Sequence, residues 1–389
     1  MPALLTPSLN NAPDSITTGL DYVRRSGILI ASDGAEYNRI AEFDPLDATS
    51  NPSLVLAAVS KPEYAHLIDE AVDYSVKKGG DLNEEERTTL ALLKLLVLVG
   101  VQILSIIPGR VSASVDPRTG YSIPAILSQA RTIISLFEEN SIPRSRILVK
   151  IPGTPEGISA AHTLEHPTDG SEPIYTNITL IFGRAQALAC AQAGLSVISP
   201  FVGRVKDWWD AQGFSLTERD PHPGMALVSS IQRAYARYGY KGKTEVMAAG
   251  FRKPEEVLAM AAGLGRPDEA FEVVPDSMKG WKRGTFLAAD LVTIPPELLA
   301  GLRSWTFPAK SPTVPKMRSQ ETEVDEDTEP IYFEARLGST TSLYESTLKN
   351  SKTERIVLDK VSEGLEKFSA DAVKLEDIVR DKVLAALRR

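Results

Sequence analysis

The stretch RILVKIPGT, residues 146–154, holds one lysine, Lys150, inside an apolar run that stops at Pro152 and Gly153. A short apolar run that is bounded by turn residues is typical of a buried strand. Lysine is among the residues that are least often fully buried in proteins. The stretch therefore predicts a strand with a cation near its carboxyl end, and this cation needs a structural or a chemical reason.

Similar apolar runs recur along the chain, and segments with helical spacing separate most of them. We predict eight strands, which lie within residues 27–33, 47–53, 109–117, 146–154, 174–182, 195–203, 244–251 and 291–299. Amphipathic helices are predicted over residues 60–78, 86–107, 123–140, 184–193 and 225–239. Strands that alternate with helices pair in parallel through right-handed crossovers, so the chain is expected to be an α/β protein. Eight such units predict a (β/α)8, or TIM, barrel.

A doubly wound open sheet is the alternative fold. That fold places a glycine-rich GxGxxG turn after its first strand. The stretch ASDGAEYN, residues 31–38, has no such pattern. The sequence therefore favours the barrel.

Beyond the barrel we expect one domain over residues 1–389 with excursions near its end. Residues 262–290 separate the last two predicted strands. Residues 306–345 are predicted to form an extended surface segment, since they begin with several prolines and an acidic run. A metal site within residues 321–329 is the alternative for that run. Apolar residues at helical spacing predict a C-terminal helix over residues 354–389.

Composition narrows the class of protein. Hydrophobic residues make up 43% and charged residues 24% of 389 residues, as in an ordinary globular enzyme. The net charge of −8 argues against a nucleic-acid partner. The single cysteine, Cys190, cannot form an internal disulfide and fits a reducing compartment. The start of the chain has no secretory pattern and no apolar stretch is long enough for a transmembrane helix, so we expect a cytoplasmic protein without a membrane partner.

Lys150 lies where a barrel enzyme carries its catalytic groups, at the carboxyl end of a strand. One interpretation is a lysine whose stem packs along the core while its amine reaches solvent. The other is a nucleophile. Apolar neighbours lower the pKa of a buried lysine, and the neutral amine can attack a carbonyl carbon to form a Schiff base.

Other polar side chains lie near the ends of the predicted strands. They are Asp33, Asp47, Asn51, Ser114, Asp116, Asn177, Thr179, Ser199, Arg204 and Arg252. Each of them alone has an alternative role as a helix cap or a turn residue. The two arginines favour an anionic substrate group such as phosphate. Among the histidines only His162 and His166 have a ligand spacing, and without a third ligand we expect no metal, with zinc as the alternative. No dinucleotide or ATP loop is evident, so no cofactor is expected.

Five longer motifs resemble a known family. They are DATSNPSLVLAA (47–58), GRVSASVD (109–116), ILVKIPGTPEGISAA (147–161), TNITLIFGRAQALACAQAGLSVISPFVGRVKDWW (176–209) and VMAAGFRK (246–253). Together they closely resemble the transaldolase family, in the same order along the chain. The resemblance implies a metal-free, class I aldolase-like (β/α)8 barrel of the pentose phosphate pathway. Its substrates would be sugar phosphates, and a homodimer is left open.

The implied reaction transfers a dihydroxyacetone unit from a ketose phosphate to an aldose phosphate. Sedoheptulose 7-phosphate and fructose 6-phosphate are the implied donors. By resemblance, Lys150 forms the Schiff base, Asp33 is the general acid and base at the donor C4 hydroxyl, and Thr179 helps to position the catalytic water. The remaining implied substrate contacts are Asn51 and Asn177 at the hydroxyl groups, Ser199 in the wall, Phe201 as a shield of the intermediate, and Arg204 and Arg252 at the phosphate.

Three positions depart from the family pattern. Ser114 stands where the family has a glutamate that shuttles protons, Gly250 where it has a serine, and Pro155 where it has a tryptophan. Serine cannot hold a proton at neutral pH, and Asp116 is either its substitute or a structural residue. The departures leave two alternatives open: a diverged Schiff-base aldolase or lyase of secondary metabolism, and a catalytically weak or non-catalytic binding protein.

Overall fold

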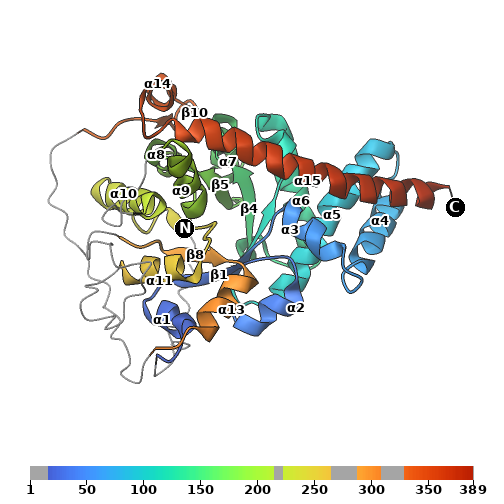
Figure 1. Ribbon diagram of the computed structural model, residues 1–389. Coiled ribbons are helices and arrows are strands. Elements are labelled where there is room, and N and C mark those ends of the chain that lie inside the picture. Colours follow the sequence, from blue (N-terminus) through green and yellow to red (C-terminus); the bar gives the residue numbers. More distant parts are fainter. Residues whose placement is uncertain (1–15, 214–221, 264–286, 308–327, 389) are drawn as a thin grey trace. The chain divides into compact units, whose positions relative to one another are not determined.

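The barrel is the centre of the fold. The computed structural model describes residues 16–213, 222–263, 287–307 and 328–388. Its eight strands form a closed barrel in chain order from β1 to β8 (Figure 1). They are β1 (Leu29–Asp33), β2 (Asp47–Thr49), β3 (Val111–Ser114), β4 (Ile147–Pro152), β5 (Thr176–Ile181), β6 (Val197–Pro200), β7 (Glu245–Ala248) and β8 (Leu291–Ile294). Each lies within a predicted strand segment, so the predicted barrel is confirmed and the open sheet is wrong.

Helices follow the strands as the periodicity predicts. The helices up to β5 are α1 (Gly19–Arg25), α2 (Tyr37–Ile40), α3 (Pro52–Val59), α4 (His66–Lys78), α5 (Glu84–Leu104), α6 (Ile123–Glu138) and α7 (Pro155–Glu165). Those after it are α8 (Arg184–Gln192), α9 (Val202–Ala211), α10 (Pro223–Arg237), α11 (Pro254–Ala262), α13 (Pro296–Ser304), α14 (Ser342–Asn350) and α15 (Ile356–Leu387). Short 3-10 turns are η2 (Ala41–Phe43), η3 (Pro117–Thr119) and η4 (Arg144–Arg146).

The chain divides into two compact units. The first, here the Lys150 unit, comprises Ser32–Thr179, Ala335–Thr340 and Val361–Arg389. The second, here the Arg252 unit, comprises Met1–Ala31, Leu180–Glu334 and Thr341–Lys360.

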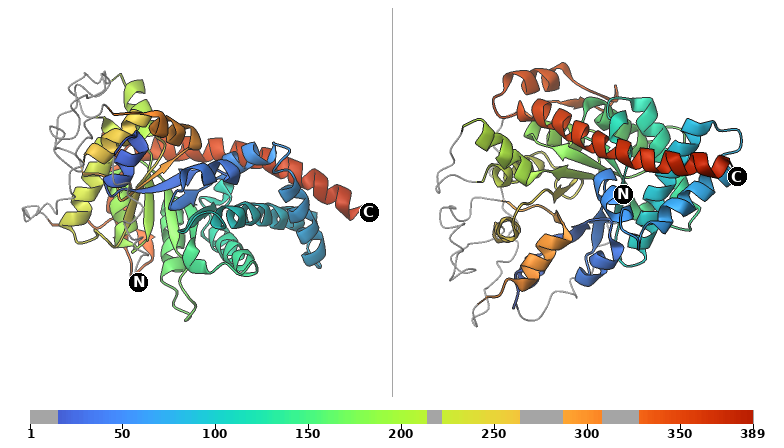
Figure 2. Two further views of the ribbon diagram at one scale, coloured as in Figure 1. Left: turned by 90° about the horizontal axis from the view of Figure 1, so that it is seen from below. Right: turned by 45° about the vertical axis from the view of Figure 1, so that its right-hand side comes forward.

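In the Lys150 unit, β3 and β4 are buried along their whole length. Parallel strands that are covered on both faces need apolar residues throughout, which explains the runs seen in the sequence. Helix α5 packs between α4 and α6, and Figure 2 shows this group from two further sides. Its length and hydropathy would suffice to cross a membrane, but 61% of its most apolar window is buried inside the protein, as in a core helix.

The predicted C-terminal helix is confirmed as α15, which is drawn in red in Figure 1. Within the Lys150 unit it is tied to α3 and η3, the elements that follow β2 and β3. The Ser53 hydroxyl donates a hydrogen bond to Asp371 over 2.6 Å, and Arg118 forms an ion pair with Glu376. Lys382 forms a third link, to Asp69 of α4. These contacts attach the helix next to the carboxyl ends of β2 and β3.

The described end of the predicted surface segment over residues 306–345 contains regular secondary structure. There β9 (Phe333–Glu334) and β10 (Ser339–Thr340) form a two-stranded sheet, and α14 begins at Ser342. The side chain of Thr341 caps α14 by accepting a hydrogen bond from the Tyr344 N–H. Residues 308–327, and residues 264–286 of the predicted 262–290 excursion, lie outside the described residues.

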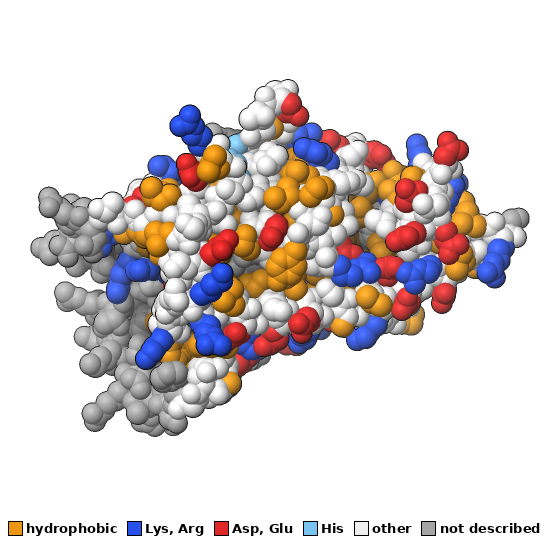
Figure 3. Space-filling model, turned by 90° about the horizontal axis from the view of Figure 1, so that it is seen from above, with side chains coloured by type: hydrophobic (Ala, Val, Ile, Leu, Met, Phe, Trp, Pro, Cys, Tyr) orange, Lys and Arg blue, Asp and Glu red, His pale blue; other side chains and the backbone are white. Residues whose placement is uncertain are grey.

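The surface has mixed charge on the face drawn in Figure 3. Lysine and arginine side chains alternate there with aspartate and glutamate, and hydrophobic side chains lie between them. A surface on which both signs are interspersed has no extended field of one sign. The described part of this face therefore shows no extended basic patch.

Candidate active site

A row of polar side chains crosses three strands of the Lys150 unit. Ser114 of β3 lies in register with Lys150 of β4, and Lys150 lies in register with Asn177 of β5. The Asn177 side-chain amide donates a hydrogen bond of 3.1 Å to Ser112, which is on a strand that is not its neighbour. Only side chains on the inner face can meet in this way. Because side chains alternate along a strand, Ser114 and Thr179 share that inner face.

Lys150 is buried among these strands. Its exposed fraction is 7%, and no hydrogen bond or ion pair joins its ammonium group to any described residue. Burial lowers the pKa of the ammonium group, and the charge of Asp33 opposes this effect. Of the two interpretations of Lys150, the structure matches the desolvated amine rather than the amine that reaches solvent.

Asp33 and Asn51 lie at the ends of β1 and β2. Asp33 is the last residue of β1, and its carboxylate accepts a hydrogen bond of 2.7 Å from the Thr49 hydroxyl. The Asn51 oxygen caps α3 by accepting a hydrogen bond from the Leu54 N–H, which leaves its amide hydrogens to donate elsewhere. Asp47 is structural instead, since its buried carboxylate forms an ion pair with Arg110.

Two hydroxyl groups share the inner face with the lysine. Thr179 is 6% exposed, and its Oγ1 is buried without a hydrogen-bond partner among the described residues. A buried hydroxyl without a partner costs free energy, and an ordered water or a substrate would satisfy it. Ser114 is 8% exposed and stands in register beside Lys150.

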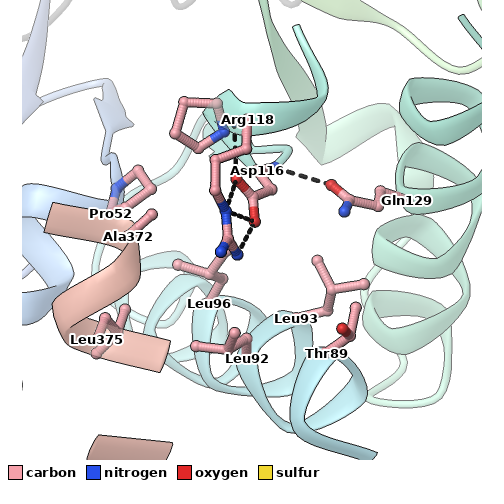
Figure 4. Close-up of a pocket in the computed structure, with 11 residues that line it drawn as sticks. Pro52, Thr89, Leu92, Leu93, Leu96, Asp116, Arg118, Gln129, Ala372 and Leu375 are labelled. Atoms are coloured by element: carbon pink, nitrogen blue, oxygen red, sulfur yellow. Dashed lines mark hydrogen bonds and ion pairs between the residues drawn. The ribbon is translucent and has the colours of Figure 1, made fainter. Parts of the chain in front are cut away.

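Asp116 does not join this row. Its carboxylate caps η3 and accepts hydrogen bonds from Arg118, with 2.9 Å between Nε and Oδ1. Figure 4 shows this pair in a pocket whose walls come from α5, α6 and α15, with Gln129 bonded to the Asp116 N–H. Of its two interpretations, the contacts match the structural one.

The Arg252 unit carries four more of the predicted residues. Ser199 in β6 is 1% exposed, and Phe201 directly before α9 is 9% exposed. The Arg204 guanidinium lies 5.4 Å from the centre of the Phe201 ring, a distance typical of a cation–π contact. Phe201 also packs against Phe182 at 5.8 Å between ring centres. One aromatic ring thus supports one of the two arginines.

Arg252 lies against the first turn of α9. Its Nη2 atom is 2.6 Å from the Asp207 carboxylate, and both side chains are about half exposed. A Cβ atom at Gly203 would come within 2.4 Å of the Gly250 carbonyl oxygen and 2.9 Å of the Arg252 side chain, so glycine permits this close approach. Gly250 has a φ of +72°, which glycine adopts without strain and which disfavours the serine of the family pattern.

Two residues of this group were missed in the sequence. Asp207 lies three positions after Arg204 on α9, and this helical spacing was the available signal. Glu256 is 8% exposed and accepts a hydrogen bond of 2.6 Å from the Arg252 N–H. Its other oxygen lies 3.4 Å from His222, which caps α10. Together these contacts fix the backbone that carries Arg252.

A metal centre finds no support in the described ranges. No group of three His, Cys, Asp or Glu side chains that could hold an ion occurs there. The rings of His162 and His166 pack against each other at 4.9 Å between centres. Glu329, the described end of the acidic run, accepts hydrogen bonds from Gln192 and Tyr240.

The burial of Lys150 predicts a pH-dependent stability change. A lysine whose folded pKa is lowered destabilises the folded state most at low pH, and the penalty fades as the pH rises towards the usual lysine pKa of about 10.4. Lys150→Met should therefore raise the free energy of unfolding by roughly 1–4 kcal/mol at pH 7, and by less at pH 10. Urea unfolding at both pH values measures this. Lys78→Met, at an exposed lysine that ends α4, is the control; an equal gain at both pH values would contradict the prediction.

The comparisons with known proteins agree with one another. The model of the family Transaldolase/Fructose-6-phosphate aldolase matches residues 30–265. Transaldolase of Saccharomyces cerevisiae is 37% identical over 369 residues, which cover 94% of this chain and 96% of that protein. Transaldolase of Bos taurus is 36% identical over 368 residues, covering 94% and 95%, and that of Schizosaccharomyces pombe is 42% identical over 244 residues, covering 63% and 73%. With this similarity along nearly its whole length, the chain belongs to the transaldolase family.

Proposed function

We propose that this protein is a transaldolase that works through a Schiff base on Lys150. It transfers a dihydroxyacetone unit from a ketose phosphate, sedoheptulose 7-phosphate or fructose 6-phosphate, to an aldose phosphate of the pentose phosphate pathway. The observation that carries the proposal is a lysine that is 7% exposed and lies in register with Ser114 and Asn177 on the inner face of three strands. The names of the relatives support the same activity.

The reaction begins with the neutral amine of Lys150. It attacks the donor carbonyl carbon, and loss of water from the carbinolamine leaves the imine. Asp33 then accepts the proton of the donor C4 hydroxyl, the bond between C3 and C4 breaks, and its electron pair moves into the nitrogen-bound three-carbon unit. The aldehyde product leaves, an aldose phosphate adds in its place, and the proton returns. Hydrolysis of the new imine frees Lys150.

The other residues bind and orient in this scheme. The amide hydrogens of Asn51 would donate to one substrate hydroxyl, and Asn177, which donates to Ser112, would bind another. The buried Thr179 hydroxyl would hold the water that is lost and regained at the imine. In the Arg252 unit, Arg204 and Arg252 would bind phosphate, Phe201 would shield the intermediate, and Ser199 would line the wall.

Ser114 favours a second candidate function, a diverged Schiff-base aldolase or lyase. A hydroxyl relays a proton but cannot store one at neutral pH, and Asp116, the nearest alternative acid in the sequence, is held by Arg118. We therefore propose that the natural protein forms its Schiff base slowly. We also propose that it works in the cytoplasm as a single domain, with a homodimer as one assembly to test.

Covalent trapping tests the proposed function. Borohydride reduction with fructose 6-phosphate should add the mass of a reduced dihydroxyacetone unit to the peptide that holds Lys150, because only a neutral buried amine forms the imine readily. Lys150→Met should abolish the adduct. Lys94→Met is the matched control, since Lys94 is also buried, and it should leave the adduct intact. Mass added at a lysine other than Lys150 would refute the assignment.

Arg252 provides a test of phosphate binding. Arg252→Ala should raise the KM for fructose 6-phosphate about tenfold to a hundredfold, the range for loss of a charge-assisted hydrogen bond. The KM for unphosphorylated dihydroxyacetone should change much less. Lys206→Ala removes a partly exposed cation from α9, the helix whose Asp207 pairs with Arg252, and is the control. Equal effects of Arg252→Ala on both substrates would argue against a phosphate role.

Ser114 predicts a gain of function. Ser114→Glu should speed single-turnover trapping at Lys150 by at least about tenfold, since general acid–base catalysis is worth about 10²–10⁴-fold. Glutamine has the same size as glutamate but no titratable group, so Ser114→Gln should give no gain in trapping rate. Asp116→Asn should leave the trapping rate unchanged. A large loss with Asp116→Asn, or no gain with Ser114→Glu, would mean that the proton path does not pass through position 114.

A further inference from the structure

Strand β5 contains a backbone conformation that a leucine rarely adopts. Leu180 has a φ of +61° and is fully buried. Two other described residues besides glycine, Asp44 and Ser141, also have positive φ, but both are exposed. A bulky residue in this region costs on the order of 1–3 kcal/mol and persists only where its surroundings enforce it.

The side chain of Gln186 binds the backbone at this conformation and just after it. Gln186 lies in the first turn of α8 and has no exposed surface. Its amide nitrogen donates a hydrogen bond of 3.0 Å to the Leu180 carbonyl, and its oxygen accepts one of 2.9 Å from the Phe182 N–H. One neutral amide thus satisfies a buried acceptor and a buried donor on either side of Ile181. We call this pair of hydrogen bonds the Gln186 clamp.

The residue that precedes Leu180 in the chain is Thr179. Its hydroxyl is buried without a partner among the described residues, although its carbonyl is fixed by the Gly153 N–H at 2.8 Å. The direction of the Thr179 side chain depends on the backbone at its own position and at the next one. A relaxed Leu180 would turn the peptide between the two residues and move the hydroxyl.

We propose that Gln186 is a positioning residue for the imine-forming step. The clamp holds Leu180 in its left-handed conformation, and this conformation fixes the exact position of the Thr179 hydroxyl on the inner face that it shares with Lys150. The inference rests on the proposed function, in which that hydroxyl holds the water lost and regained at the imine. Gln186 itself does not touch the substrate and acts only through the backbone of Leu180.

The chemistry of the clamp requires a neutral amide. An ionised carboxylate accepts from the Phe182 N–H but cannot donate to the Leu180 carbonyl, and it would face that oxygen across about 3 Å with a like partial charge. A protonated carboxyl group can donate again. Burial raises the pKa of a carboxyl group, so the introduced group of Gln186→Glu should titrate above the usual range.

The experiment measures single-turnover borohydride trapping at Lys150 with fructose 6-phosphate. Gln186→Glu and Gln186→Met should each lower the trapping rate about tenfold to a hundredfold at pH 8, since displacements of about 1 Å cost up to 10² in rate. The KM should change less than the rate. The rate of Gln186→Glu relative to the natural protein should rise as the pH falls, whereas that of Gln186→Met should not.

Gln192 provides the matched control on the same helix. Its amide donates to the Pro330 carbonyl and accepts from the Phe333 N–H over 2.8 and 2.9 Å, so it clamps a backbone far along the chain from β5. Gln192→Glu and Gln192→Met should lower the free energy of unfolding to a similar extent and leave trapping unchanged. Equal losses of trapping rate in the Gln186 and Gln192 variants would overturn the inference.

Thr179→Val separates the two proposals. If this variant traps at the natural rate, the role of Thr179 in the proposed function is wrong, and the inference about Gln186 fails with it. If Thr179→Val slows trapping while Gln186→Met matches the natural protein, the proposed function stands and the clamp is not a positioning device. Should Gln186→Glu fail to fold, Gln186→Met, which keeps the side-chain volume, decides between these outcomes.

Discussion

The removal of one ammonium group from water is the constraint on which the site depends. A buried lysine without a carboxylate partner favours its neutral form, and only the neutral form is a nucleophile. In the Lys150 unit the surrounding strands are buried along their length, and the nearest charge effect comes from Asp33, whose carboxylate is bound by Thr49. A firm ion pair with that acid would hold the amine protonated. The charge of Asp33 therefore acts on Lys150 while the Asp33 carboxylate is hydrogen-bonded to Thr49.

Most of the fold was predictable from the sequence because apolar runs and helical spacing report burial directly. All eight strands and the C-terminal helix follow from that pattern. The sheet formed by β9 and β10 was missed, since strands of two residues leave no period to detect. The strands were predicted from runs of apolar residues. The candidate residues were found because they are polar side chains within or at the ends of these runs.

The contacts that orient these residues were not predictable, and the reason is physical. Asp207 pairs with a side chain 45 positions further along the chain, and Glu256 and Gln186 bind backbone N–H groups, so no sequence pattern identifies their partners. The conformation of Leu180 is opposite to the local preference of leucine, so propensity pointed away from it. Asp116 was predicted to share the face of Ser114 because side chains alternate along a strand. In the structure its carboxylate pairs with Arg118 instead and lines a pocket together with residues of α15.

The attachment of α15 has a consequence for synthesis in the cell. Asp371 and Glu376 bind α3 and η3, the elements that follow β2 and β3, yet both are translated after every strand of the barrel. A nascent chain whose strands have already emerged from the ribosome therefore still lacks the partners of Ser53 and Arg118. The elements next to Asn51 and Ser114 reach their final contacts only after α15 has been made. Closure of the barrel alone thus does not complete this part of the molecule.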